Sequence, residues 1–178
     1  MNLKKTLIVI AAAALAACGK PAEAPAPAKQ SARPGIGAPA PAIVLNTIVS
    51  GDLKALNGWE QLRGQAVVLE FWATWCDPCV ESIAHLNELA EKFSGRPVAF
   101  ISVTQESRTK VEKFLKDREM RGNIAADGDP AFSVFRVRGI PYTVLIDRDG
   151  VVRDITYPAR VTEQRVNDLL AGGPLPPR

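Results

Sequence analysis

"EFWATWCDPC", residues 70–79, is the stretch that decides the fold, because it places two cysteines two residues apart directly behind an apolar run. The run itself, "AVVLEFW" (66–72), is nearly continuous, which predicts a β-strand covered on both faces. Pro78 suits the first turn of a helix, since its missing N–H would find no partner there. The stretch therefore predicts a buried strand that turns into a helix, with Cys76 and Cys79 at the junction.

The junction gives the two thiols an environment suited to redox chemistry. The helix dipole and the unpaired backbone N–H groups at a helix N-terminus favour the thiolate form of the first cysteine, Cys76. Two cysteines at this spacing can close a small disulfide ring without moving the backbone far. We therefore interpret the pair as a reversible two-electron switch.

Other uses of the cysteines have to be weighed against this interpretation. A zinc site needs about four ligands, but the whole chain contains three cysteines and one histidine. A purely structural disulfide suits an exported domain, although so short a loop stabilises a fold little. A cysteine–histidine hydrolase would need His85 to face a thiol, yet His85 lies about 240° round the predicted helix from Cys79. This position predicts a surface histidine.

Glu70 is the one charged side chain in the apolar run, and an unpaired buried carboxylate is costly. One interpretation is that the strand has a wetter face and that Glu70 forms a surface ion pair there. The other is that the continuous run is buried on both faces, which would raise the pKa of Glu70 towards neutrality. A carboxyl group with such a pKa can take a proton from a nearby thiol.

Strand and helix signals alternate through the rest of the chain. Residues 42–49 and 52–56, separated by Ser50-Gly51, predict an N-terminal hairpin. The later predicted elements are a helix after Pro78, a strand over 97–103, a helix opened by Thr109 with Glu112 in a capping box, a strand and helical turn within 123–135, a hairpin over 142–156 and a last helix from about Thr162 to Gly172. This alternation predicts an α/β fold with a mixed central sheet and helices on both faces.

The N-terminus has the pattern of an export signal. Residues 1–17 begin with basic Lys4 and Lys5 and continue as an apolar run. The run is shorter than the roughly 20 residues that a membrane-spanning helix needs. It ends in "LAAC", which resembles a bacterial lipobox, so we expect Cys18 to be lipidated and to become the first residue of the mature protein. A plain cleavage site with Cys18 as a stray thiol is the alternative.

The remaining boundaries follow from composition. Residues 18–40 are rich in proline and alanine, cannot bury a core and predict an extended tether. A single folded domain is expected over 41–173, with a short tail over 174–178. The formal net charge of +3, from 22 Lys and Arg against 19 Asp and Glu, is too balanced for a nucleic-acid-binding protein.

Two motifs together resemble the thioredoxin superfamily. "VVLEFWATWCDPC" (67–79) is similar to the active-site strand and loop of that family, and "RGIPYTVLIDRDG" (138–150) is similar to the segment that carries its cis-proline. The resemblance covers about residues 36–171. It implies a thioredoxin-like fold with an N-terminal hairpin and an inserted αβ segment at 105–135. With the export signal and tether, the chain resembles the TlpA/ResA type of membrane-anchored thiol-disulfide oxidoreductase, a bacterial lipoprotein.

The resemblance implies a reaction and assigns residues to it. Cys76 is expected to be exposed and to attack a disulfide of a partner protein, after which the more buried Cys79 resolves the mixed disulfide. Pro141, in the cis form, would lie against the disulfide, and Glu70 would lie beneath Cys79 and accept its proton. The expected substrate-binding surface comprises Trp75, Asp77, Pro78 and Ile140.

The same resemblance implies the partners of the protein. These are protein thiols and disulfides, a membrane thiol donor that re-reduces the site, and the membrane itself through a lipid on Cys18. We expect a monomer without cofactor or metal, facing the periplasm or the cell exterior. Members of this branch often carry a glutamate where this chain has Ser82, a proline where it has Ala84 and a threonine where it has Tyr142. These departures leave a role in one pathway, such as cytochrome c maturation, unassigned.

Two further classes of function occur on related folds. Copper-handling modules of thioredoxin-like fold use a wider cysteine spacing and a histidine far downstream, whereas no histidine follows His85 here. A thiol peroxidase would need a peroxide-activating arginine, which the sequence does not identify. Dithiol–disulfide exchange is therefore the favoured prediction, with copper handling as the alternative.

Asp77 bears on the direction of electron flow. A carboxylate beside Cys76 disfavours the thiolate and opposes the helix dipole. A less stabilised thiolate makes the reduced form the better electron donor. We therefore expect a reductant of protein disulfides.

Overall fold

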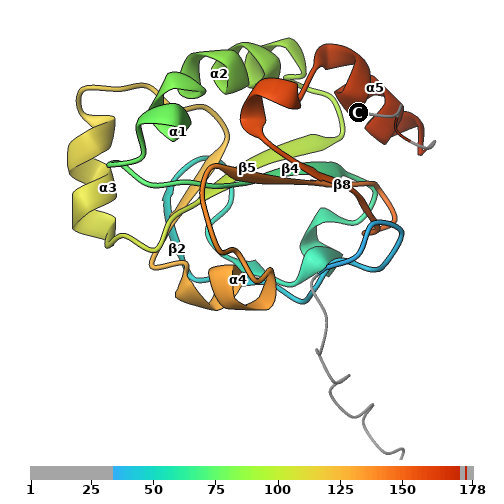
Figure 1. Cartoon of the computed structure of the whole chain (residues 1–178), viewed down its shortest axis with the longest axis horizontal. Coiled ribbons are helices and arrows are strands. Elements are labelled where there is room, and N and C mark those ends of the chain that lie inside the picture. Colours follow the sequence, from blue (N-terminus) through green and yellow to red (C-terminus); the bar gives the residue numbers. More distant parts are fainter. Residues whose placement is uncertain (1–33, 173–174, 176–178) are drawn as a thin grey trace, which may run out of the picture.

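A six-stranded mixed sheet forms the centre of the fold in the computed structural model, which describes residues 34–172 and 175 (Figure 1). Its strands, in spatial order, are β2 (Thr47–Ser50), β6 (Asn123–Ala126), β5 (Val98–Val103), β4 (Ala66–Phe71), β7 (Tyr142–Ile146) and β8 (Val152–Thr156). Strand β5 pairs in parallel with both β4 and β6, and the other neighbours are antiparallel. This sheet confirms the predicted α/β fold.

Helices cover both faces of the sheet (Figure 1). The helices are α1 (Asp77–Glu81), α2 (Ile83–Lys92), α3 (Arg108–Leu115), α4 (Asp129–Val134) and α5 (Glu163–Ala171), with single 3-10 turns η1 (Trp59–Leu62) and η2 (Pro158–Arg160). Apolar residues of α2 and α5 pack with Val68 on one face, and Val111 of α3 packs with Ile124. Ala131 of α4 packs on the opposite face with Val67.

Strand β4 supplies side chains to both of these layers. Ala66 and Val68 pack towards α2 and α5, whereas Val67 and Leu69 pack towards α4. All six residues of the strand are buried, as the continuous apolar run predicts. Because side chains alternate between the faces of a strand, Glu70 belongs to the face that α2 and α5 cover.

The N-terminal hairpin differs in part from the prediction. Strands β1 (Val44–Leu45) and β3 (Leu56–Asn57) pair antiparallel in a small separate sheet, but β2 between them leaves to pair with β6 at the edge of the main sheet. Gly51 allows this pairing, since a Cβ there would lie 2.7 Å from the backbone of Asn123. The edge of the sheet thus takes a strand that local turn signals assign to the hairpin.

Helix boundaries show one correction and one confirmation. The predicted capping box at Thr109 and Glu112 is wrong, because α3 begins at Arg108 after Ser107, and Glu112 lies 3.2 Å from the Arg108 guanidinium instead. The last helix is confirmed. Thr162 caps α5 by accepting a hydrogen bond from the backbone N–H of Arg165, and the helix ends before a glycine in the left-handed region.

The chain N-terminal to the sheet also packs on the domain. The backbone of residues 37–40 exchanges hydrogen bonds with residues 150–152 of the β7–β8 hairpin. This part of the expected tether therefore lies against the domain. The predicted signal peptide, Cys18 and all of the 174–178 tail except Leu175 lie outside the described residues.

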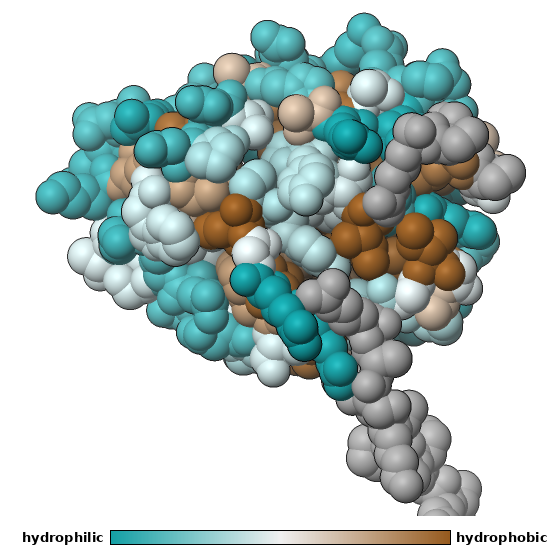
Figure 2. Space-filling model, in the orientation of Figure 1, coloured by the Kyte–Doolittle hydropathy of each residue, from teal (hydrophilic) through white to brown (hydrophobic). Residues whose placement is uncertain are grey.

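The surface is largely polar on the side of the described residues that Figure 2 shows. Hydrophilic residues cover most of this face, and apolar residues reach the surface only in small patches between them. Among the described residues, no helix combines the length and apolarity needed to cross a membrane.

Candidate active site

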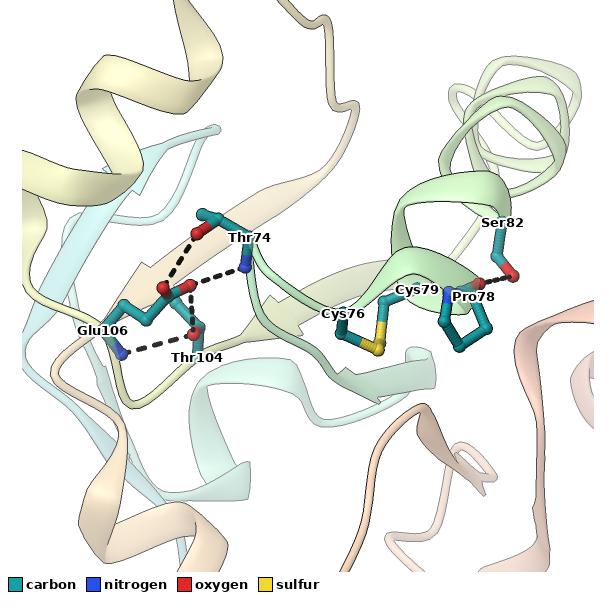
Figure 3. Close-up of a disulfide and its surroundings, with 7 residues drawn as sticks. All are labelled: Thr74, Cys76, Pro78, Cys79, Ser82, Thr104 and Glu106. Carbon is teal, nitrogen blue, oxygen red and sulfur yellow. Dashed lines mark hydrogen bonds between the residues drawn. A yellow bond between two sulfur atoms is a disulfide. The ribbon is translucent and has the colours of Figure 1, made fainter.

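Cys76 and Cys79 form a disulfide at the start of α1 (Figure 3). Cys76 is the N-cap residue of that helix, and Pro78 lies in its first turn. The Cα atoms of the two cysteines are 5.2 Å apart, a separation that suits a disulfide. The backbone N–H of Cys79 donates to the carbonyl oxygen of Cys76 at 2.9 Å. The predicted strand-to-helix junction is confirmed.

The disulfide is less exposed than expected. Cys76 is 4% exposed and Cys79 1% exposed, so the expectation of an exposed Cys76 is wrong for this oxidised form. The reason is packing, because both cysteines belong to an apolar cluster with Trp72, Val111 and other side chains of the α3 side. Cys76 is still the more exposed of the two residues.

The residues expected to bind substrate surround this buried pair. Trp75 is 67% exposed, and Asp77 and Pro78 are exposed at the start of α1. The Ile140–Pro141 bond is cis, as the resemblance implies, and Ile140 packs against the cluster that contains the disulfide. Pro141 directly precedes β7, the neighbour of β4. The structure thus brings an exposed aromatic ring and the cis-proline segment to the same end of the sheet as the cysteines.

Glu70 is buried, which contradicts the interpretation that it points to solvent. It is 2% exposed and accepts one hydrogen bond, from the Ser102 hydroxyl at 3.3 Å. Burial raises the pKa of Glu70 to about 8, and the hydrogen bond from Ser102 only partly opposes this rise. Near neutral pH the carboxyl group can therefore hold or release a proton.

The register of the sheet places Glu70 on the side of the disulfide. Glu70 lies opposite Ser102 on β5 and Thr143 on β7, and Ser102 in turn lies opposite Ile124 on β6. Residues directly opposite in a sheet share a face. Because Ile124 packs in the cluster with Cys79, Glu70 faces the same layer as Cys79.

Glu106 is a site residue that sequence reasoning missed. Its Oε2 accepts a hydrogen bond from the backbone N–H of Thr74 at 2.6 Å, and its Oε1 accepts one from the Thr74 hydroxyl at 2.8 Å (Figure 3). The Lys110 ammonium lies 2.5 Å from Oε1. Burial disfavours the charged form, but the hydrogen bonds from Lys110 and Thr74 outweigh it and hold the pKa of Glu106 below its usual value.

The sequence positions of Thr74 and Glu106 contain a signal for their contact. Thr74 follows β4 by three residues and Glu106 follows β5 by three residues, and the two strands are parallel neighbours. The carboxyl ends of parallel neighbours meet at one edge of a sheet, so polar residues after them can meet. The pairing of these strands is what the sequence alone did not provide.

Two further residues of the helix after the cysteines have structural contacts. The Ser82 hydroxyl donates to the carbonyl oxygen of Pro78 at 2.8 Å, at the point where α1 ends and α2 begins. A ring nitrogen of His85 lies 2.8 Å from the carbonyl oxygen of Val161. His85 is therefore a partly buried link between α2 and the segment before α5, whereas the sequence predicts a surface histidine. In residues 34–172, no group of three or more His, Cys, Asp and Glu side chains could hold a metal ion.

A cysteine pair at a strand-to-helix junction, a cis-proline at the same end of the sheet and a mixed sheet between helices define a thiol-disulfide oxidoreductase of thioredoxin-like fold. The chain belongs to the Redoxin family, whose model matches residues 36–171. This match spans nearly all of the described domain.

Known relatives agree with this class. The thiol-disulfide oxidoreductase ResA of Bacillus cereus is 30% identical over 131 residues, which are 72% of this chain and 73% of that protein. ResA of Geobacillus kaustophilus is 34% identical over 122 residues, 67% of this chain and 68% of the relative. Among solved structures, a thiol:disulfide interchange protein of the DsbE type from Chlorobium tepidum has a TM-score of 0.66 at 26% identity, covering 76% of this chain and 98% of its own. The protein is a thiol-disulfide oxidoreductase.

Proposed function

We propose that this oxidoreductase reduces disulfides of exported proteins while anchored to a bacterial membrane through Cys18. The observation that carries the proposal is the Cys76–Cys79 pair at the start of α1 with a buried acid in the strand behind it. The exposed carboxylate of Asp77 in the first turn supports the direction, since it opposes stabilisation of the Cys76 thiolate.

The reaction runs through a mixed disulfide. The Cys76 thiolate attacks one sulfur of the partner's disulfide, so that a bond between Cys76 and the partner forms, the partner's own S–S bond breaks and one partner thiolate leaves. The Cys79 thiolate then attacks the Cys76 sulfur and releases the second partner thiolate. Two electrons pass to the partner, and Cys76 and Cys79 end as the disulfide.

Glu70 serves the second of these steps. Cys79 must lose its proton before it attacks, and the carboxylate form of Glu70, on the same face of the sheet, takes that proton. Because the pKa of Glu70 is about 8, its carboxylate has a high enough proton affinity to accept the Cys79 proton near neutral pH. Glu70 also supplies the acid that is missing at Ser82.

The partner binds to the residues around the disulfide, which we call the rim: Trp75, Asp77, Pro78 and Ile140. Trp75 offers an exposed aromatic surface, and Asp77 and Pro78 lie beside it on α1. The backbone of Ile140, before the cis bond to Pro141, is available to a bound peptide strand. We infer that the protein binds an extended disulfide-containing segment across this rim as a monomer.

The cellular setting rests on the N-terminal sequence. A lipid on Cys18 would hold the domain at the membrane, on the periplasmic or outer side, where a membrane thiol donor re-reduces the Cys76–Cys79 disulfide after each turnover. We propose no cofactor. The partner protein that becomes trapped on Cys76 in Cys79→Ser identifies the pathway that uses the reduced product.

Trapping tests the proposal directly. In full-length Cys79→Ser, Cys76 can attack a partner but the mixed disulfide cannot be resolved, so partner proteins should accumulate on Cys76 and be released by dithiothreitol. Cys76→Ser is the matched control and should trap nothing. Equal trapping by the two variants, or failure of the wild type to reduce insulin disulfides with dithiothreitol as donor, would contradict the proposal. Copper titration of the reduced wild type tests the alternative function.

A further inference from the structure

We propose that Glu106 is a positioning residue for the thiol-disulfide exchange, because its carboxylate holds the turn that delivers Cys76 to the start of α1. The inference concerns the attack by Cys76 and therefore rests on the chemistry of the cysteine pair. The proposal assigns a role in the reaction to Glu106 of the inserted segment at 105–135, which follows β5.

The turn consists of residues 73–76. The backbone N–H of Cys76 donates to the carbonyl oxygen of Ala73 at 3.1 Å, which closes the turn. Thr74 is its second residue, and both of its hydrogen-bond donors, the backbone N–H and the hydroxyl, are taken by the two oxygens of Glu106. Figure 3 shows Thr74 on the segment that leads to Cys76, with the Glu106 carboxylate facing it. Trp75 and Cys76 follow directly, so a shift of Thr74 moves both.

Glu106 is itself fixed by its surroundings. Its backbone N–H donates to the Thr104 hydroxyl at 3.2 Å, and its carbonyl oxygen accepts from the N–H of Asp127 at 2.9 Å. The N–H of Gly128 donates to the carbonyl oxygen of Thr104 at 2.9 Å. A Cβ on Gly128 would lie 2.4 Å from a methyl group of Val103, so the segment after β6 closes tightly on the end of β5. The carboxylate therefore extends from a well-held backbone.

The charge of Glu106 also points to a specific task. Its side chain is only 9% exposed, and burying a carboxylate is costly unless it is paired and hydrogen-bonded. Lys110, in the first turn of α3, supplies the counter-charge, and Thr74 supplies the donors. A carboxylate can accept from both donors of one residue at once, which a single hydroxyl or carbonyl at this position would do less well. The Glu106 side chain therefore connects Lys110 of α3 to the turn at residues 73–76.

The test compares variants that remove the charge with variants that remove the contacts. Glu106→Gln loses the charge but can still accept the Thr74 N–H and donate to its hydroxyl, whereas Glu106→Ala loses both contacts. In full-length protein carrying Cys79→Ser, we expect the rate constant of Cys76 with a disulfide substrate to fall about tenfold in Glu106→Ala and to recover to within about threefold of the parent in Glu106→Gln. Exchange of the Thr74 amide hydrogen should accelerate in Glu106→Ala alone.

Two controls keep the test falsifiable. Glu112→Ala removes a glutamate of α3 that forms an ion pair with Arg108 and not with the turn at 73–76, and it should leave the rate unchanged. Thr74→Val removes one of the two contacts, and adding it to Glu106→Ala should cause no further loss, because coupled residues are not additive. Equal losses in Glu112→Ala and Glu106→Ala, a rate in Glu106→Ala equal to that of the parent, or additive losses in the double variant would overturn the proposal. If Glu106→Ala does not fold, Thr74→Val and Glu106→Gln alone decide it, since loss of the hydroxyl contact should slow Cys76 more than loss of the charge.

Discussion

Glu70 combines a cost in stability with the use in the reaction that we propose for it. The side chain lies inside a fully buried strand and has one hydrogen bond of 3.3 Å to Ser102. A carboxylate with so little compensation is destabilised, which is why its pKa rises to about 8. A well-packed neutral side chain would stabilise the sheet better, and for this reason we propose that the acid serves proton transfer at Cys79.

The kinetic prediction at Glu70 concerns the second step. Glu70→Gln should leave the attack by Cys76 largely intact and slow the release of the partner by about 10²-fold, the scale of a lost general base. Stopped-flow reduction of a disulfide substrate between about pH 5 and 9 measures both steps. Glu60→Gln, at an exposed glutamate of η1, is the control. Resolution at the wild-type rate with an unchanged pH profile would show that Glu70 is only a strand residue.

Stability provides an independent prediction for the same residue. Because the folded pKa of about 8 lies above the ordinary value of 4.5, folding favours the protonated acid. This contribution to the free energy of unfolding is fully present below pH about 4.5 and is lost as the pH rises to about 8. Urea unfolding at several pH values should show wild type losing stability over this window relative to Glu70→Gln. A constant difference between the two proteins would contradict the assignment.

At the scale of elements, the two ends of α5 can be understood from local chemistry. Thr162 begins the helix with a side-chain cap, and Gly172 ends it in the left-handed region with φ 73°. Ser107 precedes α3 in the same position, but its side chain makes no capping hydrogen bond. The two helices therefore provide a matched pair of N-caps.

The caps lead to a prediction on stability without effect on activity. Thr162→Ala should lower the free energy of unfolding by about 1 kcal/mol, because one helix N–H loses its partner. Ser107→Ala should change it by a few tenths of a kcal/mol at most. Urea denaturation measures both changes, and insulin reduction should be unaffected in each variant. Equal losses at the two positions would mean that the hydrogen bond at Thr162 does not stabilise α5.

Elements whose signals are local could be predicted from the sequence, and contacts between distant segments could not. The buried β4, the junction at Cys76 and the ends of α5 follow from periodicity, proline and capping residues. The move of β2 to the sheet edge depends on pairing with β6, which no local pattern encodes. The contact of Glu106 with Thr74 likewise depends on which strands are neighbours. Burial of Cys76 depends on side chains of α3 that lie far along the chain.

At the scale of the whole molecule, the domain and its N-terminal segment are not separate. Residues 37–40 are hydrogen-bonded to residues 150–152, at a hairpin remote in sequence from the cysteines. A tether attached there would hold the domain by the β7–β8 hairpin. The anchor itself is a proposal from the sequence around Cys18.

The anchor can be tested by fractionation. Cys18→Ala should move the full-length protein from the membrane fraction into the soluble fraction, because a lipidated cysteine carries the acyl chains that hold it. Mass spectrometry of the wild-type N-terminus should show the added lipid mass. Unchanged membrane retention of the variant, together with no added mass on the wild type, would contradict lipidation.

The central claim is that the Cys76–Cys79 pair cycles as a reductant, and its midpoint potential tests this most directly. Full-length protein is equilibrated with glutathione buffers of graded ratio, and the reduced fraction is counted by alkylation and mass spectrometry. The carboxylate of Asp77 beside Cys76 predicts a midpoint nearer thioredoxin's value of about −270 mV than the value of about −120 mV typical of a strong oxidant. A midpoint above about −180 mV would contradict the account.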